Sequence, residues 1–234
     1  MTRLTFLHGS VTNAGRSWGR QRELAGRYEL FLPNRPGFPP GPPVEQVDFE
    51  AEVPWFASIV RRGDHVVAHS YGGVVALLAA PSLPLASLTL IEPPAFGVAA
   101  GDRAVRSWVA RSRALHGDLR TFVDAFLELV GAPMRLPDPL PPDLRQGAEA
   151  FVAERRPDEA RIPLAPLPYP VLVVTGDHEP AFEAVADVLV ARLGAERAVL
   201  PGAGHAAQFA PGFNELLVRF VEQVSDTGSV SDTS

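Results

Sequence analysis

Short runs of apolar and β-branched residues alternate with helix-forming stretches along most of the 234-residue chain. This alternation is typical of a mainly parallel sheet with helices on both faces, because two parallel strands must be joined by a long crossover. The sequence predicts about six strands, at residues 4–7, 28–32, 65–68, 87–91, 171–175 and 197–200. Core helices are predicted at residues 18–25, 50–61, 71–80, 181–193 and 213–224.

One stretch, residues 101–161, breaks this alternation because it carries no strand signal. Its clearest helix is predicted at residues 118–130, where apolar side chains recur at helical spacing, with Asp118 as N-cap and Gly131 beyond its end. Ligands of open α/β sheets bind at the carboxyl ends of the strands. We therefore expect residues 95–164 to form a helical lid over that edge; a packing subdomain without a role in binding is the alternative.

The predicted core comprises residues 1–94 and 165–224. Residues 33–43 are rich in proline, which excludes a helix and favours a long surface loop. The last ten residues, 225–234, are polar and contain Gly, Ser and Thr, so a disordered tail is predicted there.

Composition narrows the classes of function. A net charge of −6 with no basic cluster argues against nucleic-acid partners and anionic membranes. The absence of cysteine excludes disulfides, thiolate catalysis and cysteine metal sites. No signal segment or membrane-length apolar run stands out, which favours a cytoplasmic monomer or homodimer that acts on a small molecule.

The motif A-H-S-Y-G-G, residues 68–73, joins a predicted strand to a predicted helix. A sharp turn of this kind holds its central residue in a strained backbone conformation and needs small neighbours, which Ala68 and Gly72 provide. The motif departs from G-x-S-x-G only by Ala68 in place of the first glycine. Ser70 is therefore the candidate nucleophile, and an ordinary helix-capping serine is the alternative.

A serine hydroxyl needs a base to take its proton. His205 ends the Gly-rich turn P-G-A-G-H after the last predicted strand, from which a loop can reach back over Ser70. It is the preferred base among the six histidines, and the alternative is a surface histidine.

The developing oxyanion would need two backbone N–H donors. We expect them from Tyr71, directly after the nucleophile, and from Ser10 in the L-H-G-S loop after the first strand. A plain turn at Gly9 is the alternative for that loop.

With these motifs in place, the chain resembles the α/β-hydrolase superfamily over almost its whole length. The resemblance rests on L-H-G-S, N-R-P-G-F (34–38), A-H-S-Y-G-G, T-G-D-H-E-P (175–180) and G-A-G-H (202–205), in family order. The start of the chain, with Trp18, is similar to small-lid plant methylesterases and hydroxynitrile lyases. The segment T-G-D-H-E-P, called the acid loop below, is similar to the corresponding loop of the menaquinone-pathway SHCHC synthases. The resemblance implies an α/β-hydrolase fold. We expect it without the antiparallel strands that many relatives place first, because the sequence starts directly at the strand before His8.

The resemblance also indicates where the acid of a catalytic triad would lie. Family members usually carry it three residues after the glycine that closes the penultimate strand, which is Glu179 here. Glu179 is therefore the preferred acid, although it is also suited to the N-terminus of a helix that begins at Pro180. Asp177 and Glu92, the latter after the preceding strand as in some relatives, remain alternatives.

Together these features predict a carboxylesterase-like serine hydrolase that cleaves an ester or related acyl bond through an acyl-enzyme. Aromatic residues suggest a small apolar substrate, although they could equally form the core of the lid; they are Trp108, Phe122, Phe126, Phe151, Phe38 and Phe96. No cofactor or metal is expected. The alternatives are a C–C hydrolase or lyase that uses the triad to abstract a proton, and a receptor with a vestigial triad.

Overall fold

The computed structural model describes residues 1–132 and 135–231. Within them, six strands form one parallel sheet in the order β2-β1-β3-β4-β5-β6. Their bounds are Arg3–Leu7 (β1), Glu29–Phe31 (β2), His65–His69 (β3), Ser87–Ile91 (β4), Val171–Thr175 (β5) and Glu196–Val199 (β6). The α/β class and the predicted strands are confirmed, with each strand end within one residue of its predicted position.

The register of the central strands brings their carboxyl ends to a common edge. His69, the last residue of β3, pairs with Ile91, the last residue of β4. Ile91 in turn pairs with Val174 near the end of β5. Ser70 and Glu92 directly follow β3 and β4, so they lie side by side at the carboxyl edge of the sheet.

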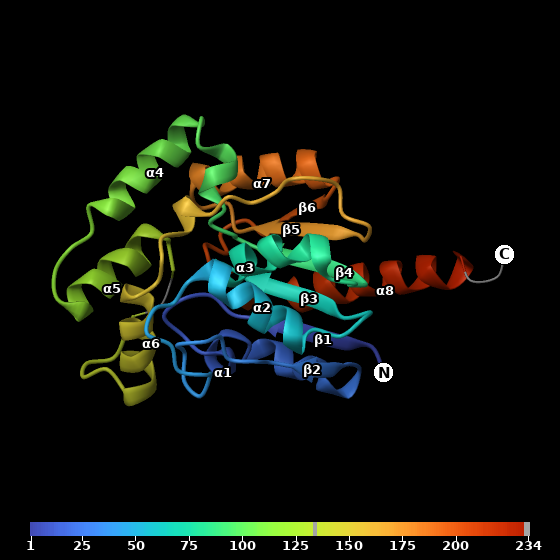
Figure 1. Cartoon of the computed structure of the whole chain (residues 1–234), viewed down its shortest axis with the longest axis horizontal. Coiled ribbons are helices and arrows are strands. Elements are labelled where there is room, and N and C mark those ends of the chain that lie inside the picture. The colour runs from blue at the N-terminus through green and yellow to red at the C-terminus, as the bar shows by residue number, and fades with distance from the viewer. Residues whose placement is uncertain (133–134, 232–234) are drawn as a thin grey trace.

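Helices cover both faces of the sheet because side chains of a strand alternate between its two faces. One layer contains α2 (Phe49–Ile59), α3 (Tyr71–Ala79) and α7 (Pro180–Leu193), packed on strand residues such as Ala68 and Leu90. The other contains α1 (Ala14–Ser17) and α8 (Phe213–Ser231), packed on residues such as Val67. Figure 1 shows α2 and α3 in front of the sheet and α8 behind it.

Three further helices gather at one end of the sheet, at the left of Figure 1. They are α4 (Arg103–Arg113), α5 (Leu119–Leu129) and α6 (Pro142–Val152). Asp118 caps α5 by accepting a hydrogen bond from the N–H of Thr121, and Gly131 follows with a positive φ of 62°. Val123 and Ala148 belong to a separate small core that joins α5 to α6.

Three segments differ from what the sequence predicts. The helix expected at residues 18–25 is a 3₁₀-helix, η1 (Arg20–Gly26), preceded by the short α1. Helix α8 extends to Ser231 instead of giving way to a disordered tail at 225, because an existing helix adds residues without a new nucleation step; residues 232–234 lie outside the described residues. The proline-rich loop contains no helix, as expected, but its Arg35 and Phe38 are buried.

Among the residues that the structure describes, none of the helices has the length and apolar character needed to cross a membrane.

Candidate active site

Ser70 stands at a sharp turn between β3 and α3, with φ 51° and ψ −127°. L-residues rarely adopt this conformation, so the surrounding structure must enforce it. A Cβ on Gly72 would lie 2.5 Å from the carbonyl oxygen of His8, and one on Gly9 would lie 2.8 Å from the Cβ of Ser70. The neighbouring glycines are thus required for close packing around the strained serine.

The loop after β6 brings His205 to Ser70, and its Nε2 lies 2.8 Å from Ser70 Oγ. Gly204 has a φ of 66°, and a Cβ on Gly176 would lie 2.0 Å from the carbonyl oxygen of Gly204. The His205 carbonyl accepts a hydrogen bond of 3.0 Å from His69 Nε2. Burial lowers the pKa of His69 to about 3, so this second imidazole is neutral and holds the loop.

Glu92 follows β4 with a φ of 47° and is fully buried. Its Oε2 lies 3.6 Å from Nδ1 of His205, and its Oε1 accepts a 2.6 Å hydrogen bond from the N–H of Gly176. Burial acts to raise the pKa of Glu92, but His178 and His205 outweigh it and lower the pKa to about 2. The carboxylate is therefore ionised at neutral pH beside the ring of His205.

The two other candidate acids lie elsewhere. Glu179 is the N-cap residue of α7, and its Oε2 forms a 2.7 Å ion pair with Arg111 of α4. Asp177 has a φ of 54° and lies with Glu179 beside an outer hollow. Neither has a described contact with His205, so the structure brings Glu92, and not Glu179 or Asp177, to the imidazole.

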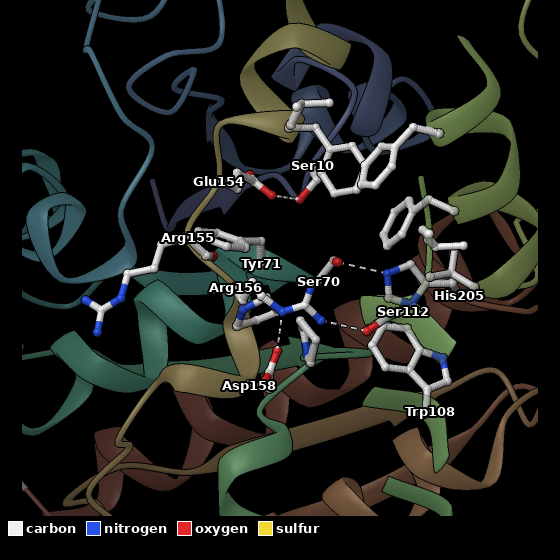
Figure 2. A pocket seen from close by; sticks show the side chains of 18 of the residues that line it. Ser10, Ser70, Tyr71, Trp108, Ser112, Glu154, Arg155, Arg156, Asp158 and His205 are labelled. Atoms are coloured by element: carbon white, nitrogen blue, oxygen red, sulfur yellow. Dashed lines mark hydrogen bonds and ion pairs between the residues drawn. The ribbon is translucent and has the colours of Figure 1, made fainter. Parts of the chain in front are cut away.

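Ser10 and Tyr71 line the same cavity as Ser70 and His205. Tyr71 is the first residue of α3, so its N–H has no acceptor within the helix. The hydroxyl of Ser10 donates a 2.5 Å hydrogen bond to Oε2 of Glu154, as Figure 2 shows. Both residues predicted for the oxyanion hole are thus next to the nucleophile.

Behind Ser10 lies a buried ionic network that was not predicted from the sequence. Arg35 forms two 2.8 Å hydrogen bonds with Glu52 and one of 3.0 Å with Glu154, and it also donates to the carbonyl of Gly9 at 3.1 Å. The only signal was the N-R-P-G-F motif, since Glu154 is 119 positions from Arg35. The network fixes the loop that carries Ser10.

This network predicts a pH-dependent stability. Burial raises the pKa of Glu154 from 4.5 to about 7, with Glu52 adding to the rise, although Arg35 and the Ser10 hydroxyl oppose it. As the pH increases from 4.5, the unfolded chain loses this proton before the folded one, so the contribution of Glu154 to the free energy of unfolding falls until about pH 7. At about 1.4 kcal/mol per pKa unit, the loss approaches about 3 kcal/mol. Burial lowers the pKa of His8 and His69 to about 3, and these two groups act in the opposite direction below about pH 6.5.

We expect Glu154→Gln to remove this decline, because an amide does not titrate. Urea unfolding at pH 5 and pH 8 measures the change for each variant. Glu149→Gln on the exposed face of α6 is the matched control and should retain the wild-type slope. An identical change in stability between pH 5 and pH 8 in Glu154→Gln and wild type would assign the pH dependence to other groups.

The cavity in front of Ser70 has a volume of about 170 Å³. Most of its apolar wall comes from residues 95–164, namely Trp108, Leu115, Phe122, Phe126, Val130, Phe151, Val152 and Pro157, and the rest comes from Pro94 and Phe182. Arg156 also lines the cavity, and it donates hydrogen bonds to Asp158 at 3.1 Å and to Ser112 at 2.9 Å, as Figure 2 shows. Of the predicted aromatic residues, Phe38 and Phe96 do not line the cavity; Phe96 packs on Trp108 with ring centroids 4.4 Å apart.

Among the described residues, one group of histidine and acidic side chains has the spacing of metal ligands. It consists of Glu92, His178 and His205, whose ligand atoms lie within 4.8 Å of one another. Sequence reasoning placed His178 only in the acid loop.

Comparison with protein families agrees with the fold. A model described as the alpha/beta hydrolase family matches residues 6–213. The chain therefore belongs to the α/β-hydrolase family, which confirms the resemblance found in the sequence and supports a hydrolase. No curated protein matches the chain in sequence.

Solved structures show the same fold at low identity. MenH from S. aureus is 18% identical, has a TM-score of 0.68, and aligns over 96% of this chain and 94% of its own. Est816, described as an N-acyl homoserine lactone degrading enzyme, is 18% identical with a TM-score of 0.62 over 94% and 93%. VinJ is 13% identical with a TM-score of 0.70 over 95% and 90%.

Proposed function

We propose that the protein is a serine hydrolase that cleaves a carboxylic ester or a related acyl bond of a small apolar substrate. The observation that carries this proposal is the 2.8 Å approach of His205 Nε2 to Ser70 Oγ at a strained turn facing an apolar cavity. Glu92 is the proposed third member of the triad, because its ionised carboxylate faces Nδ1 of the same imidazole.

In the proposed reaction, Ser70 Oγ attacks the acyl carbon while its proton passes to Nε2 of His205. The carbonyl oxygen becomes an oxyanion, which the N–H groups of Ser10 and Tyr71 stabilise. The imidazolium then gives its proton to the leaving alcohol, and an acyl-serine remains. Water, activated by His205, attacks the acyl-serine and restores the free hydroxyl of Ser70. Throughout, Glu92 stabilises the imidazolium and fixes its orientation.

The cavity limits the group that this site can accept. At about 170 Å³ it is close to the roughly 150 Å³ cavity that holds benzene in an engineered protein. Its aromatic wall favours a short alkyl or aryl group over a charged one. Helices α4, α5 and α6 supply most of this wall, which supports the proposal that residues 95–164 act as a lid.

A fluorophosphonate probe tests the proposal directly, because it modifies only an activated serine. We expect one label per chain, attached to Ser70 by peptide mass spectrometry, and a burst of p-nitrophenol from p-nitrophenyl butyrate as the acyl-enzyme accumulates. Labelling without a burst would favour a lyase or C–C hydrolase, in which the triad abstracts a proton. Labelling at another serine, or none, would contradict the assigned nucleophile.

A further inference from the structure

His178 occupies a position that the proposed reaction does not use. It lies between β5 and α7, with its ring 5.3 Å from that of Phe182. The backbone of Gly131 approaches its other side, where a Cβ would lie 2.9 Å from His178 Cδ2. The side chain is 11% exposed, and neither ring nitrogen has a hydrogen-bond partner among the described residues. A buried imidazole with two unpartnered nitrogens is costly unless something binds it.

Two other buried polar atoms next to His178 also have no hydrogen-bond partner among the described residues. They are Glu92 Oε2 and His205 Nδ1, and their side chains are 0% and 7% exposed. His178 Nδ1 lies 3.6 Å from Glu92 Oε1, and His205 Nδ1 lies 3.6 Å from Glu92 Oε2. These separations exceed the usual length of a hydrogen bond.

Each separation is also the one expected between a carboxylate oxygen and an imidazole nitrogen that bind the same metal ion. The two separations involve different oxygens of Glu92, which therefore lies between the two imidazoles, and one ligand atom from each of the three residues lies within 4.8 Å of the others. Zinc binds histidine nitrogen and carboxylate oxygen at about 2.0–2.2 Å, so two ligands of a tetrahedral ion lie roughly 3.3–3.6 Å apart. Two histidines and one glutamate also form a ligand set that zinc commonly takes, whereas magnesium and calcium prefer oxygen ligands. The geometry therefore favours a transition metal over the hard cations.

We propose that Glu92, His178 and His205 bind one Zn²⁺ or a similar divalent transition metal, and that this binding switches the hydrolase off. Inhibition rests on the proposed function, whereas the metal site itself does not. A neutral imidazole that gives its Nδ1 lone pair to a metal carries its proton on Nε2. His205 would then have no lone pair with which to accept the proton of Ser70, and Glu92 would no longer be free to stabilise the imidazolium.

The surface beside His178 offers a route for a cation. A hollow there is lined by His178 together with Asp177, Glu179 and other acidic side chains. Arg111 pairs with Glu179, but Asp177 has no described ion pair. Negative charge at this entrance raises the local concentration of dications.

Zinc binding is best measured by isothermal titration calorimetry on wild type and on Ser70→Ala, which keeps all three ligands. We expect one Zn²⁺ per chain in both proteins and much weaker binding of Mg²⁺. His178→Phe keeps a ring against Phe182 but removes both nitrogens, so it should weaken zinc binding by tenfold or more. His116→Phe, at an exposed histidine, is the matched control and should bind as wild type does. Melting temperatures show whether each variant is folded.

Ester hydrolysis supplies the second measurement. Zinc should inhibit wild type and His116→Phe at the concentration at which it binds, EDTA should restore the rate, and His178→Phe should require at least tenfold more zinc. Equal zinc affinity in folded His178→Phe and wild type would overturn the site. Stoichiometric binding without inhibition would overturn the switch. If the protein hydrolyses no ester, calorimetry on the same variants still decides the metal site, separately from the proposed function.

Discussion

Ser70→Ala is expected to lower kcat for ester hydrolysis by roughly 10⁴- to 10⁶-fold, because the nucleophile and its base act as a unit. The loss should fall on kcat, since Ser70 forms its bond to the substrate only in the reaction itself. Steady-state rates with p-nitrophenyl butyrate measure the effect.

The substitution should not disturb the fold. Alanine keeps the Cβ that packs against Gly9, and the backbone of residue 70 is held by its hydrogen bonds to Ile91 and Gly73. Ser58→Ala on the exposed surface of α2 is the matched control and should stay within twofold of the wild-type rate. If Ser70→Ala keeps more than a tenth of the wild-type rate, the acyl-enzyme mechanism at this residue is wrong.

The sheet and the strained turn were predictable because their signals are local. Short runs rich in apolar and β-branched residues identify β3, β4 and β5, and small residues beside Ser70 indicate a close approach of backbone segments. The position of His205 followed from chain order and from the Gly-rich turn that it ends. In each case a few adjacent residues carry enough information, because parallel sheets with right-handed crossovers leave little choice of topology.

The acid and the network around Ser10 depend on contacts between distant segments. Spacing after Gly176 favoured Glu179, but Arg111, 68 positions away in α4, forms an ion pair with its carboxylate. Glu154 reaches Ser10 across 144 positions and gives no local signal. The partner of a charged side chain depends on which segments pack next to it. The sequence pattern of a helix predicts which face is buried, but not which distant segment that helix packs against.

The choice of acid leads to the second large effect. Glu92→Gln should reduce kcat by up to about 10⁴-fold and leave KM nearly unchanged, because an amide favours the wrong tautomer of the catalytic histidine while the geometry survives. Gln retains a carbonyl oxygen that can accept the hydrogen bond from Gly176, so the strand ends should stay in place.

The variant should also change the pH dependence of stability. The pKa of Glu92 is lowered to about 2 in the folded protein, so its stabilising effect is present above the ordinary value of 4.5 and is lost as the pH falls towards 2. Glu92→Gln should flatten this acid limb. A structural carboxylate outside the triad would move the stability curve without lowering kcat, so the two measurements together separate a role in catalysis from a role in folding.

Glu179→Gln and Asp177→Asn are the matched controls, since each removes one negative charge from the neighbouring loop. Both should stay within a few-fold of the wild-type kcat, because the Glu179 carboxylate binds Arg111 and neither residue has a described hydrogen bond or ion pair with His205. Loss of the Arg111 ion pair, which is half exposed on the arginine side, should cost little stability. Measurement of kcat for the three variants decides the assignment. If Glu179→Gln loses activity and Glu92→Gln does not, the acid loop must turn towards His205 in the working enzyme, and Glu179 is the acid.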